Sequence, residues 1–304
     1  MIEKIYFSLF LIEKNFTYYK YNEVIKMEEK EVTYSFSKLS CFETCKRQYF
    51  YNYILKTEQK DNVYTLLGSS IHDLVESLQQ GEVTREMAIE KLETDFELFD
   101  ILGFKFPSEK TKENYQKSIT HFFRNFEPVH NSEFEIEKEV GFDLEGRKFV
   151  GYVDLLLHDS NGGVTIVDYK TSSKYTGDKL IHASRQLILY GIALEHMGYK
   201  VNGCKFNMLK YASVAGKNGR TKTEQRCDLT DEPNEPLYVS VPYNDYTKQE
   251  AIEWALDLIE QIESFTIFDT YEPTFNSFYC NTLCSFCDSC DECKNNKSKF
   301  FSGR

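Results

Sequence analysis

The sequence contains no apolar stretch long enough for a transmembrane helix, which needs about 20 such residues. Its opening, MIEKIYFSLFLIEKNF, has a short apolar run, but charged residues bracket it too closely for a secretory signal peptide. An excess of positive charge is also missing, because 36 Lys and Arg stand against 48 Asp and Glu. These absences favour a cytoplasmic protein that does not coat nucleic acid indiscriminately. They do not exclude a local basic groove on an otherwise acidic surface.

Tryptophan is scarce, with one residue, although Tyr and Phe bring the aromatic content to 15%. With 304 residues, 41% of them hydrophobic, the chain can bury the core of one large domain or two modest ones. In the cytoplasm its nine cysteines are expected to be reduced, which favours metal ligation over disulfides.

The hydrophobic pattern changes period near the middle of the chain. Helical spacing predicts four helices, over about 35–56, 66–81, 84–100 and 108–126. Alternation then predicts three hairpin-connected strands within 133–171, further strands over 200–213 and 236–243, and helices over 184–198 and 247–265. We therefore expect a dispensable extension at 1–33, a helical region at 34–130, an α/β core at 131–270 and a cysteine tail at 271–304.

The segments GYVDLLL and IVDYKTSSK carry the most informative polar residues. Asp168 and Lys170 are two apart in a strand and so share one face. Asp154 lies on the preceding strand, about as far from the hairpin turn as Asp168. A solvent-facing hairpin with an ion-paired lysine is the simpler interpretation, but each acid sits in an apolar run where a bare carboxylate is costly. The pattern favours a site for Mg²⁺ or Mn²⁺, which prefer oxygen ligands.

Two further pairs of polar residues are four apart and so share a helix face. Gln186 and Tyr190 follow the strand that carries Lys170, whereas His72 and Glu76 lie on the second helix. His72 sits just past the edge of that helix's apolar stripe, where it could bind a metal from outside the core.

Four cysteines crowd into LCSFCDSCDEC at 283–293, and their chemistry has several interpretations. One interpretation is a local iron–sulfur cluster bound by Cys284, Cys287, Cys290 and Cys293. Fewer residues separate the last two cysteines here than in the cysteine motif of bacterial ferredoxins. A local tetrathiolate zinc site is another option, although such sites usually separate two cysteine pairs by a longer loop.

Taken together, these motifs resemble the RecB-like branch of the PD-(D/E)XK nucleases. The closest likeness is to its iron–sulfur members, the AddB-type nuclease domains and the four-cysteine exonucleases of CRISPR adaptation. The matching pieces follow the family's order over roughly residues 34–293: YSFSKLSCFETCKRQYFYNYI, LGSSIHDLVE, FVGYVDLLL, VDYKTSSK, RQLILYG and CSFCDSCDEC. One departure is Lys46 after Cys45, where the family usually has proline.

The resemblance implies a restriction-endonuclease-like fold, with a mixed central sheet flanked by helices, and a metal-dependent DNA nuclease. Its implied metal ligands are His72, Asp154, Asp168 and the Tyr169 carbonyl, with Lys170 as the catalytic lysine. Gln186 and Tyr190 would position DNA or the lysine, and Glu76 would support the metal site. A [4Fe–4S] cluster would take Cys45, Cys284, Cys287 and Cys293, leaving Cys290 spare.

The resemblance also implies partners and a cellular setting. The substrate would be DNA, single-stranded or at unwound ends, in a bacterial, archaeal or phage-infected cell. The settings are recombination, repair, phage replication or CRISPR adaptation, with a helicase or another protein of those pathways as partner. Lys174, Lys179 and Arg185 are expected to supply local positive charge, as is a hairpin at 217–222. The alternative is a non-catalytic iron–sulfur subunit that binds DNA ends, but the complete set of two acids and a lysine argues against it.

Overall fold

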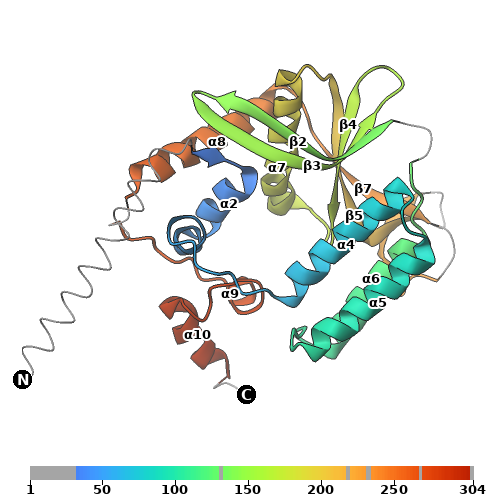
Figure 1. The fold of residues 1–304 in the computed structure, drawn as a ribbon, viewed down its shortest axis with the longest axis horizontal. Helices are drawn as coiled ribbons and strands as arrows, with labels where there is room; N and C mark the ends of the chain where they lie inside the picture. Colours follow the sequence, from blue (N-terminus) through green and yellow to red (C-terminus); the bar gives the residue numbers. More distant parts are fainter. Residues whose placement is uncertain (1–31, 130–132, 217–219, 231–233, 267–268, 302–304) are drawn as a thin grey trace, which may run out of the picture.

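A central mixed sheet with helices on both faces organises the protein (Figure 1). The computed structural model describes residues 32–129, 133–216, 220–230, 234–266 and 269–301. Nearly all of the expected extension at 1–33 lies outside these residues, as does Lys217 of the expected DNA-contacting hairpin. The expected α/β class, with a mixed sheet flanked by helices, is confirmed.

The helices of the first half lie close to their expected positions. They are α2 (Phe36–Thr44), α3 (Lys46–Tyr49), a π-helical turn (Phe50–Ile54), α4 (Val63–Gln80), α5 (Arg85–Ile101) and α6 (Glu109–Arg124). Ser35 begins α2 by accepting a hydrogen bond from the Lys38 amide at 3.2 Å. The prediction of a single helix over 35–56 is wrong, because Cys45 has extended backbone angles and separates α2 from α3.

The second half supplies most of the sheet and the remaining helices. The strands are β1 (Thr33–Tyr34), β2 (Phe134–Leu144), β3 (Arg147–His158), β4 (Val164–Lys170), β5 (Val201–Ala215), β6 (Thr221–Gln225) and β7 (Glu235–Val241). The helices are α7 (Gly177–His196), α8 (Asp245–Ser264), α9 (Ser277–Thr282) and α10 (Asp291–Phe301). Strands β2, β3 and β4 form the expected consecutive antiparallel hairpins.

Strand β5 joins the hairpins to the rest of the sheet. It pairs in parallel with β4 and antiparallel with β6 and β7. Because β7 takes the opposite edge, β4 and β6 share one edge of β5. The pairing with β4 ends at Met208, and the pairing with β6 begins at Tyr211.

Each face of the sheet buries its own apolar cluster. Helices α2, α7 and α8 cover one face, where Phe42, Leu187 and Ile259 are buried. Helices α4, α5 and α6 cover the other, where Leu67, Leu92 and Phe122 are buried (Figure 1). Among the described residues, no helix has the length and apolar character needed to cross a membrane.

One contact between α7 and the sheet requires a glycine. A Cβ atom at Gly151 of β3 would lie 2.2 Å from the ring of Tyr190, so only a residue without a side chain lets the ring approach. Tyr190 is itself buried, and therefore its ring has little room to move.

We expect Gly151→Ala to lower the free energy of unfolding by about 1–3 kcal/mol, because the added methyl group overpacks this contact. Denaturant unfolding of the purified protein measures the change. Gly203→Ala in β5 is the matched control, since a Cβ there meets no atom within 4 Å. Equal stabilities of the two variants would contradict the packing argument.

Candidate active site

The β3–β4 hairpin carries two buried carboxylates. Its antiparallel register pairs Leu155 with Val167, so Asp154 and Asp168 occupy the next pair of facing positions. Their side chains are 13% and 3% exposed. The structure thus brings together the two acids that the sequence places at matching distances from the turn.

Lys170 ends β4 and connects the acids to α7. Its Nζ lies 2.6 Å from Asp168 Oδ1 and donates a hydrogen bond to Gln186 Oε1 at 3.3 Å. The Gln186 amide in turn donates to Tyr190 Oη at 3.3 Å. The acid–lysine pair and the polar pair on α7, recognised separately in the sequence, therefore form one connected group.

Burial dominates the electrostatics of this group. It raises the pKa of Asp154 and Asp168, each to about 6, because a carboxylate is poorly solvated inside the sheet, while the Lys170 charge opposes the rise. Burial also lowers the pKa of Lys170, but the charges of Asp168, Tyr175 and Asp154 together outweigh burial and hold that pKa above its usual value. One ammonium thus faces two buried carboxyls, and a further cation would balance the charge.

His72 approaches the carboxylates from α4, on the helical side of the site. Its Nδ1 lies 3.5 Å from Asp154 Oδ2, and its ring meets that of Tyr169 edge-on at 6.5 Å. Asp154 Oδ2 also accepts a hydrogen bond from the Tyr169 amide at 2.8 Å. Burial lowers the pKa of His72, which favours the neutral imidazole that can ligate a metal.

These donors suit a divalent cation by their chemistry. Two carboxylates and a neutral imidazole lie near the Tyr169 backbone, and carboxylate and carbonyl oxygens are the ligands that Mg²⁺ and Mn²⁺ prefer. Across the ranges that the structure describes, no three His, Cys, Asp or Glu side chains are already drawn together in metal-binding geometry. A bound ion would have to draw these side chains inward.

Glu76 lies one turn after His72, beside an acid that sequence reasoning missed. Glu137 belongs to β2, where its φ of 47° is left-handed and interrupts the pairing between Ile136 and Lys138. Burial raises the pKa of Glu76 to about 7, and the nearby charge of Glu137 adds to that rise. Nothing in the alternating acids of EFEIEKEV marks Glu137, because the irregularity that turns it toward α4 is a property of the folded sheet.

Two of the basic residues expected to contact DNA already have protein partners. Lys174 donates a hydrogen bond to Thr223 Oγ1 at 3.0 Å. Arg185 pairs with Glu43 at 3.2 Å and stacks over Trp254 at 4.9 Å. Both contacts join α7 or its preceding loop to neighbouring elements, and a DNA-binding role for either residue stays a prediction.

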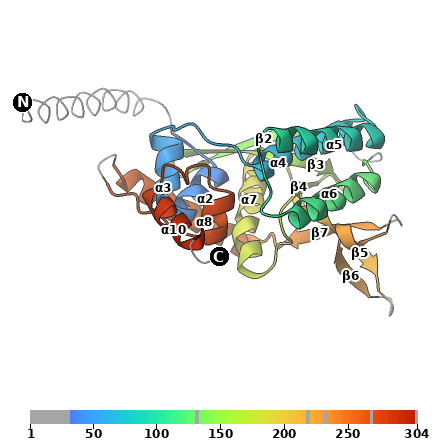
Figure 2. The same cartoon turned by 90° about the horizontal axis from the view of Figure 1, so that it is seen from below.

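Helices α2 and α3 lie beside the C-terminal segment with α9 and α10 (Figures 1 and 2), and cysteines of both parts lie close together. Five of them, Cys45, Cys280, Cys284, Cys290 and Cys293, line one small cavity. Burial raises the pKa of Cys284, and the charges of Cys280, Cys45 and Cys290 raise it further. The structure therefore places the tail beside Cys45, and the cluster that the resemblance implies there stays a prediction.

The pairing within the tail departs from expectation. Cys287 and Cys293 form a disulfide, whereas the sequence predicts reduced thiols and the resemblance implies two cluster ligands. The turn before α10 places their Cα atoms 5.3 Å apart, a separation that a disulfide spans. Cys290, expected to be spare, is buried against the same cavity. In the described part of the tail these thiols form no ready-made metal site.

The raised pKa of Asp154 predicts a pH-dependent stability of the metal-free protein. Because its folded pKa of about 6 exceeds its unfolded value, the carboxyl stabilises the fold below about pH 4, and this contribution is lost as pH rises through 6. Asp154→Asn should therefore gain up to about 2 kcal/mol over the wild type between pH 4 and pH 7. Thermal unfolding in EDTA measures the difference, and a difference that does not change with pH would contradict the burial argument.

Comparison with known proteins now places the site in a family. The family described as "PD-(D/E)XK nuclease superfamily" matches residues 33–293, a range that includes the acids, Lys170 and the cysteine tail. The solved structure described as "Crystal structure of SSO0001" aligns over 93% of this chain and 97% of its own, with 17% identity and a TM-score of 0.36. Comparison with curated proteins found no match. The extent of the family match shows that the chain belongs to the PD-(D/E)XK nuclease superfamily.

Proposed function

We propose that this chain is a metal-dependent DNA nuclease that degrades single-stranded or unwound DNA from an end. The observation that carries the proposal is the buried group of Asp154, Asp168 and Lys170 on adjacent strands. Membership of the nuclease superfamily supports the reaction class. The finer assignment, a RecB-like exonuclease, rests on the order of the sequence motifs.

Each side chain of the group has a distinct role in this proposal. His72, Asp154, Asp168 and the Tyr169 carbonyl would hold Mg²⁺ or Mn²⁺, which supplies Lewis acidity for phosphodiester hydrolysis. Lys170 presents an ammonium next to Asp168, where it stabilises negative charge that develops on the phosphate.

Residues behind the site hold these groups in place. Gln186 accepts the hydrogen bond from Lys170 and is itself bound to Tyr190, so α7 fixes the lysine's direction. Glu76 supports the metal site from α4, one turn beyond His72, where burial and then the surrounding acids raise its pKa. Both contributions are positioning rather than chemistry at the phosphate.

We further propose that the cysteine tail binds a [4Fe–4S] cluster through Cys45, Cys284, Cys287 and Cys293. Its support is the meeting of Cys45 with the tail at one cavity. Binding would require reduction of the Cys287–Cys293 bond, and Cys280 or Cys290 could substitute as ligands because both lie at the same place. A cluster there would tie the helical region at 34–130 to the tail at 271–304, around the nuclease core at 131–270.

The biological setting follows from the same resemblance. A nuclease of this kind would act in the cytoplasm on ends produced during recombination, repair, phage replication or CRISPR adaptation. A helicase or another protein of those pathways would supply the unwound strand.

Removing the lysine should abolish cleavage without abolishing binding. We expect Lys170→Met to lower the rate of DNA cleavage with Mn²⁺ by at least about 100-fold, because the developing charge loses its ammonium. Affinity for single-stranded DNA in EDTA should change less than about threefold. Lys200→Met, an exposed lysine at the start of β5, is the control and should cleave normally. Cleavage that persists in Lys170→Met would remove Lys170 from the site, and wild-type protein that binds DNA but never cleaves it would favour the non-catalytic alternative.

Anaerobic purification tests the cluster. The wild-type protein should be brown, with about four irons per chain, and Cys45→Ser should lose most of that iron. Cys227→Ser is the matched control, because Cys227 lies beside Gln225, away from the cavity, and should leave the iron content unchanged. A colourless protein that contains zinc would contradict the cluster and leave the nuclease site untouched.

A further inference from the structure

A cavity of about 530 Å³ opens directly beyond the end of β4. Strand β4 leaves the edge of β5 after Lys170, which pairs with Met208, and β6 takes over the same edge at Tyr211. The loop 171–173 forms one wall of the cavity, and Lys210 and Tyr211 of β5 form another. The cavity therefore begins one residue from the lysine of the candidate active site, and its size is typical of small-ligand pockets.

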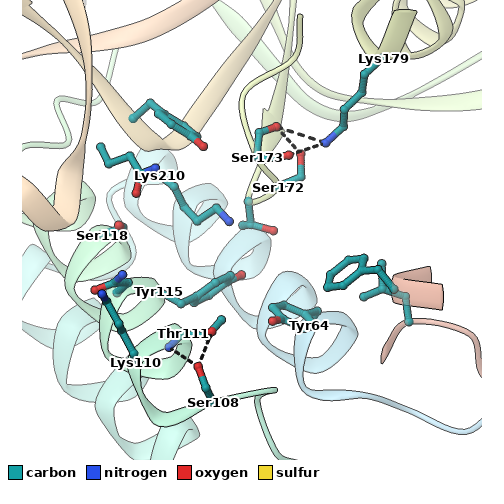
Figure 3. A pocket seen from close by; sticks show the side chains of 16 residues that line it. Tyr64, Ser108, Lys110, Thr111, Tyr115, Ser118, Ser172, Ser173, Lys179 and Lys210 are labelled. Carbon is teal, nitrogen blue, oxygen red and sulfur yellow. Dashed lines mark hydrogen bonds between the residues drawn. The ribbon is translucent and has the colours of Figure 1, made fainter. Parts of the chain in front are cut away.

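Three other segments enclose this cavity. The first two turns of α6 contribute Lys110 and Tyr115, and α4 contributes Tyr64. The cysteine tail contributes Phe278 and Leu283. Figure 3 shows that Tyr64, Tyr115 and Lys210 extend toward the same space from different elements.

The charge of the lining differs from that of the whole protein. Lys110, Lys179 and Lys210 line the cavity, and no Asp or Glu does so among the described residues, although acids outnumber bases by 48 to 36 in the sequence. Lys179 donates a hydrogen bond to Ser173 Oγ at 2.7 Å, which holds the 171–173 loop (Figure 3). Among the residues that the structure describes, no carboxylate forms an ion pair with Lys210, whose Nζ lies 5.1 Å from the ring centre of Tyr115. Burial lowers the pKa of Lys210 to about 8, so a bound anion would stabilise its charged form.

The aromatic lining complements these cations. Tyr64 and Tyr115 meet edge-on, with ring centres 5.9 Å apart. Phe278 is 59% exposed at the rim, so a face of its ring is open for a base to stack on. Lysines combined with exposed aromatic rings are typical of surfaces that bind single-stranded nucleic acid, where rings stack on bases and cations contact phosphates.

We propose that this pocket binds one nucleotide of a single DNA strand next to the scissile phosphate. Lys210 and Lys110 contact its phosphates, and Phe278 stacks on its base. A base still paired in a duplex is excluded, because β5, α6 and the tail close around the pocket from different sides. The proposal rests on the nuclease function proposed above and assigns a binding site to its single-stranded substrate.

The pocket also gives the cysteine tail a direct part in substrate binding. Asn62, at the start of α4, donates a hydrogen bond to the Leu283 carbonyl at 3.1 Å, and Lys60 pairs with Asp288 at 3.0 Å. These contacts hold the wall that carries Phe278 against α4. The segment that contains the cysteines thus builds one side of the pocket.

Two matched pairs of variants test the pocket. We expect Phe278→Ala and Lys110→Met to weaken binding of a fluorescein-labelled oligothymidylate about tenfold, measured by anisotropy on the full chain in EDTA. Lys110→Met and Lys210→Met should each also reduce the slope of log affinity against log salt by about 0.7. Tyr246→Ala on α8 and Lys117→Met on α6 are exposed controls and should stay within twofold of wild type.

The outcomes separate this proposal from the nuclease function. If Phe278→Ala and Lys110→Met both bind with the wild-type affinity and salt slope, the pocket proposal is overturned, whatever the cleavage activity. Both side chains are exposed, so this result is readable even if Lys210→Met does not fold. Weakened binding in these variants, together with a wild-type protein that never cleaves DNA with Mn²⁺, would sustain the pocket and overturn the nuclease function. Equal weakening for a blunt duplex of the same sequence would overturn the single-strand assignment.

Discussion

The ion pair of Lys170 with Asp168, which faces Asp154 across the β3–β4 hairpin, sets the arrangement of the candidate site. Two carboxylates inside a sheet are costly unless positive charge is close, and one lysine compensates for only part of that cost. Such an arrangement is a poor way to stabilise a fold. The arrangement is explained if a cation binds between the carboxylates, and the surrounding elements are placed so as to supply its other ligands.

The two layers of helices contribute different parts of this site. From one face, α7 supplies Gln186 and Tyr190, and Gly151 lets the tyrosine lie close against β3. From the other face, α4 brings His72 to Asp154. Because the acids sit where both layers meet the sheet, neither layer can shift without moving a side chain of the group. The long-range packing that forms the core therefore also sets the positions of the side chains in the candidate active site.

Much of this arrangement could be predicted from the sequence because it follows from local rules. Equal distances from a hairpin turn place Asp154 opposite Asp168, and a spacing of two places Lys170 on the face of Asp168. A spacing of four pairs Gln186 with Tyr190. The features that the sequence did not predict depend on tertiary structure instead. The extended residue at Cys45 breaks a helix whose apolar spacing is continuous, and the left-handed Glu137 interrupts a regular alternation. The pocket beyond β4 lies where β4 leaves the edge of β5 and β6 takes its place, an arrangement that no local pattern indicates.

We propose above all that Asp154, Asp168 and His72 bind one divalent cation. The most direct measurement is anomalous diffraction at the manganese edge from crystals soaked in Mn²⁺. We predict a single strong peak within coordination distance of both carboxylates, the His72 imidazole and the Tyr169 carbonyl. A peak that avoids these residues, or no peak at saturating Mn²⁺, would contradict the claim.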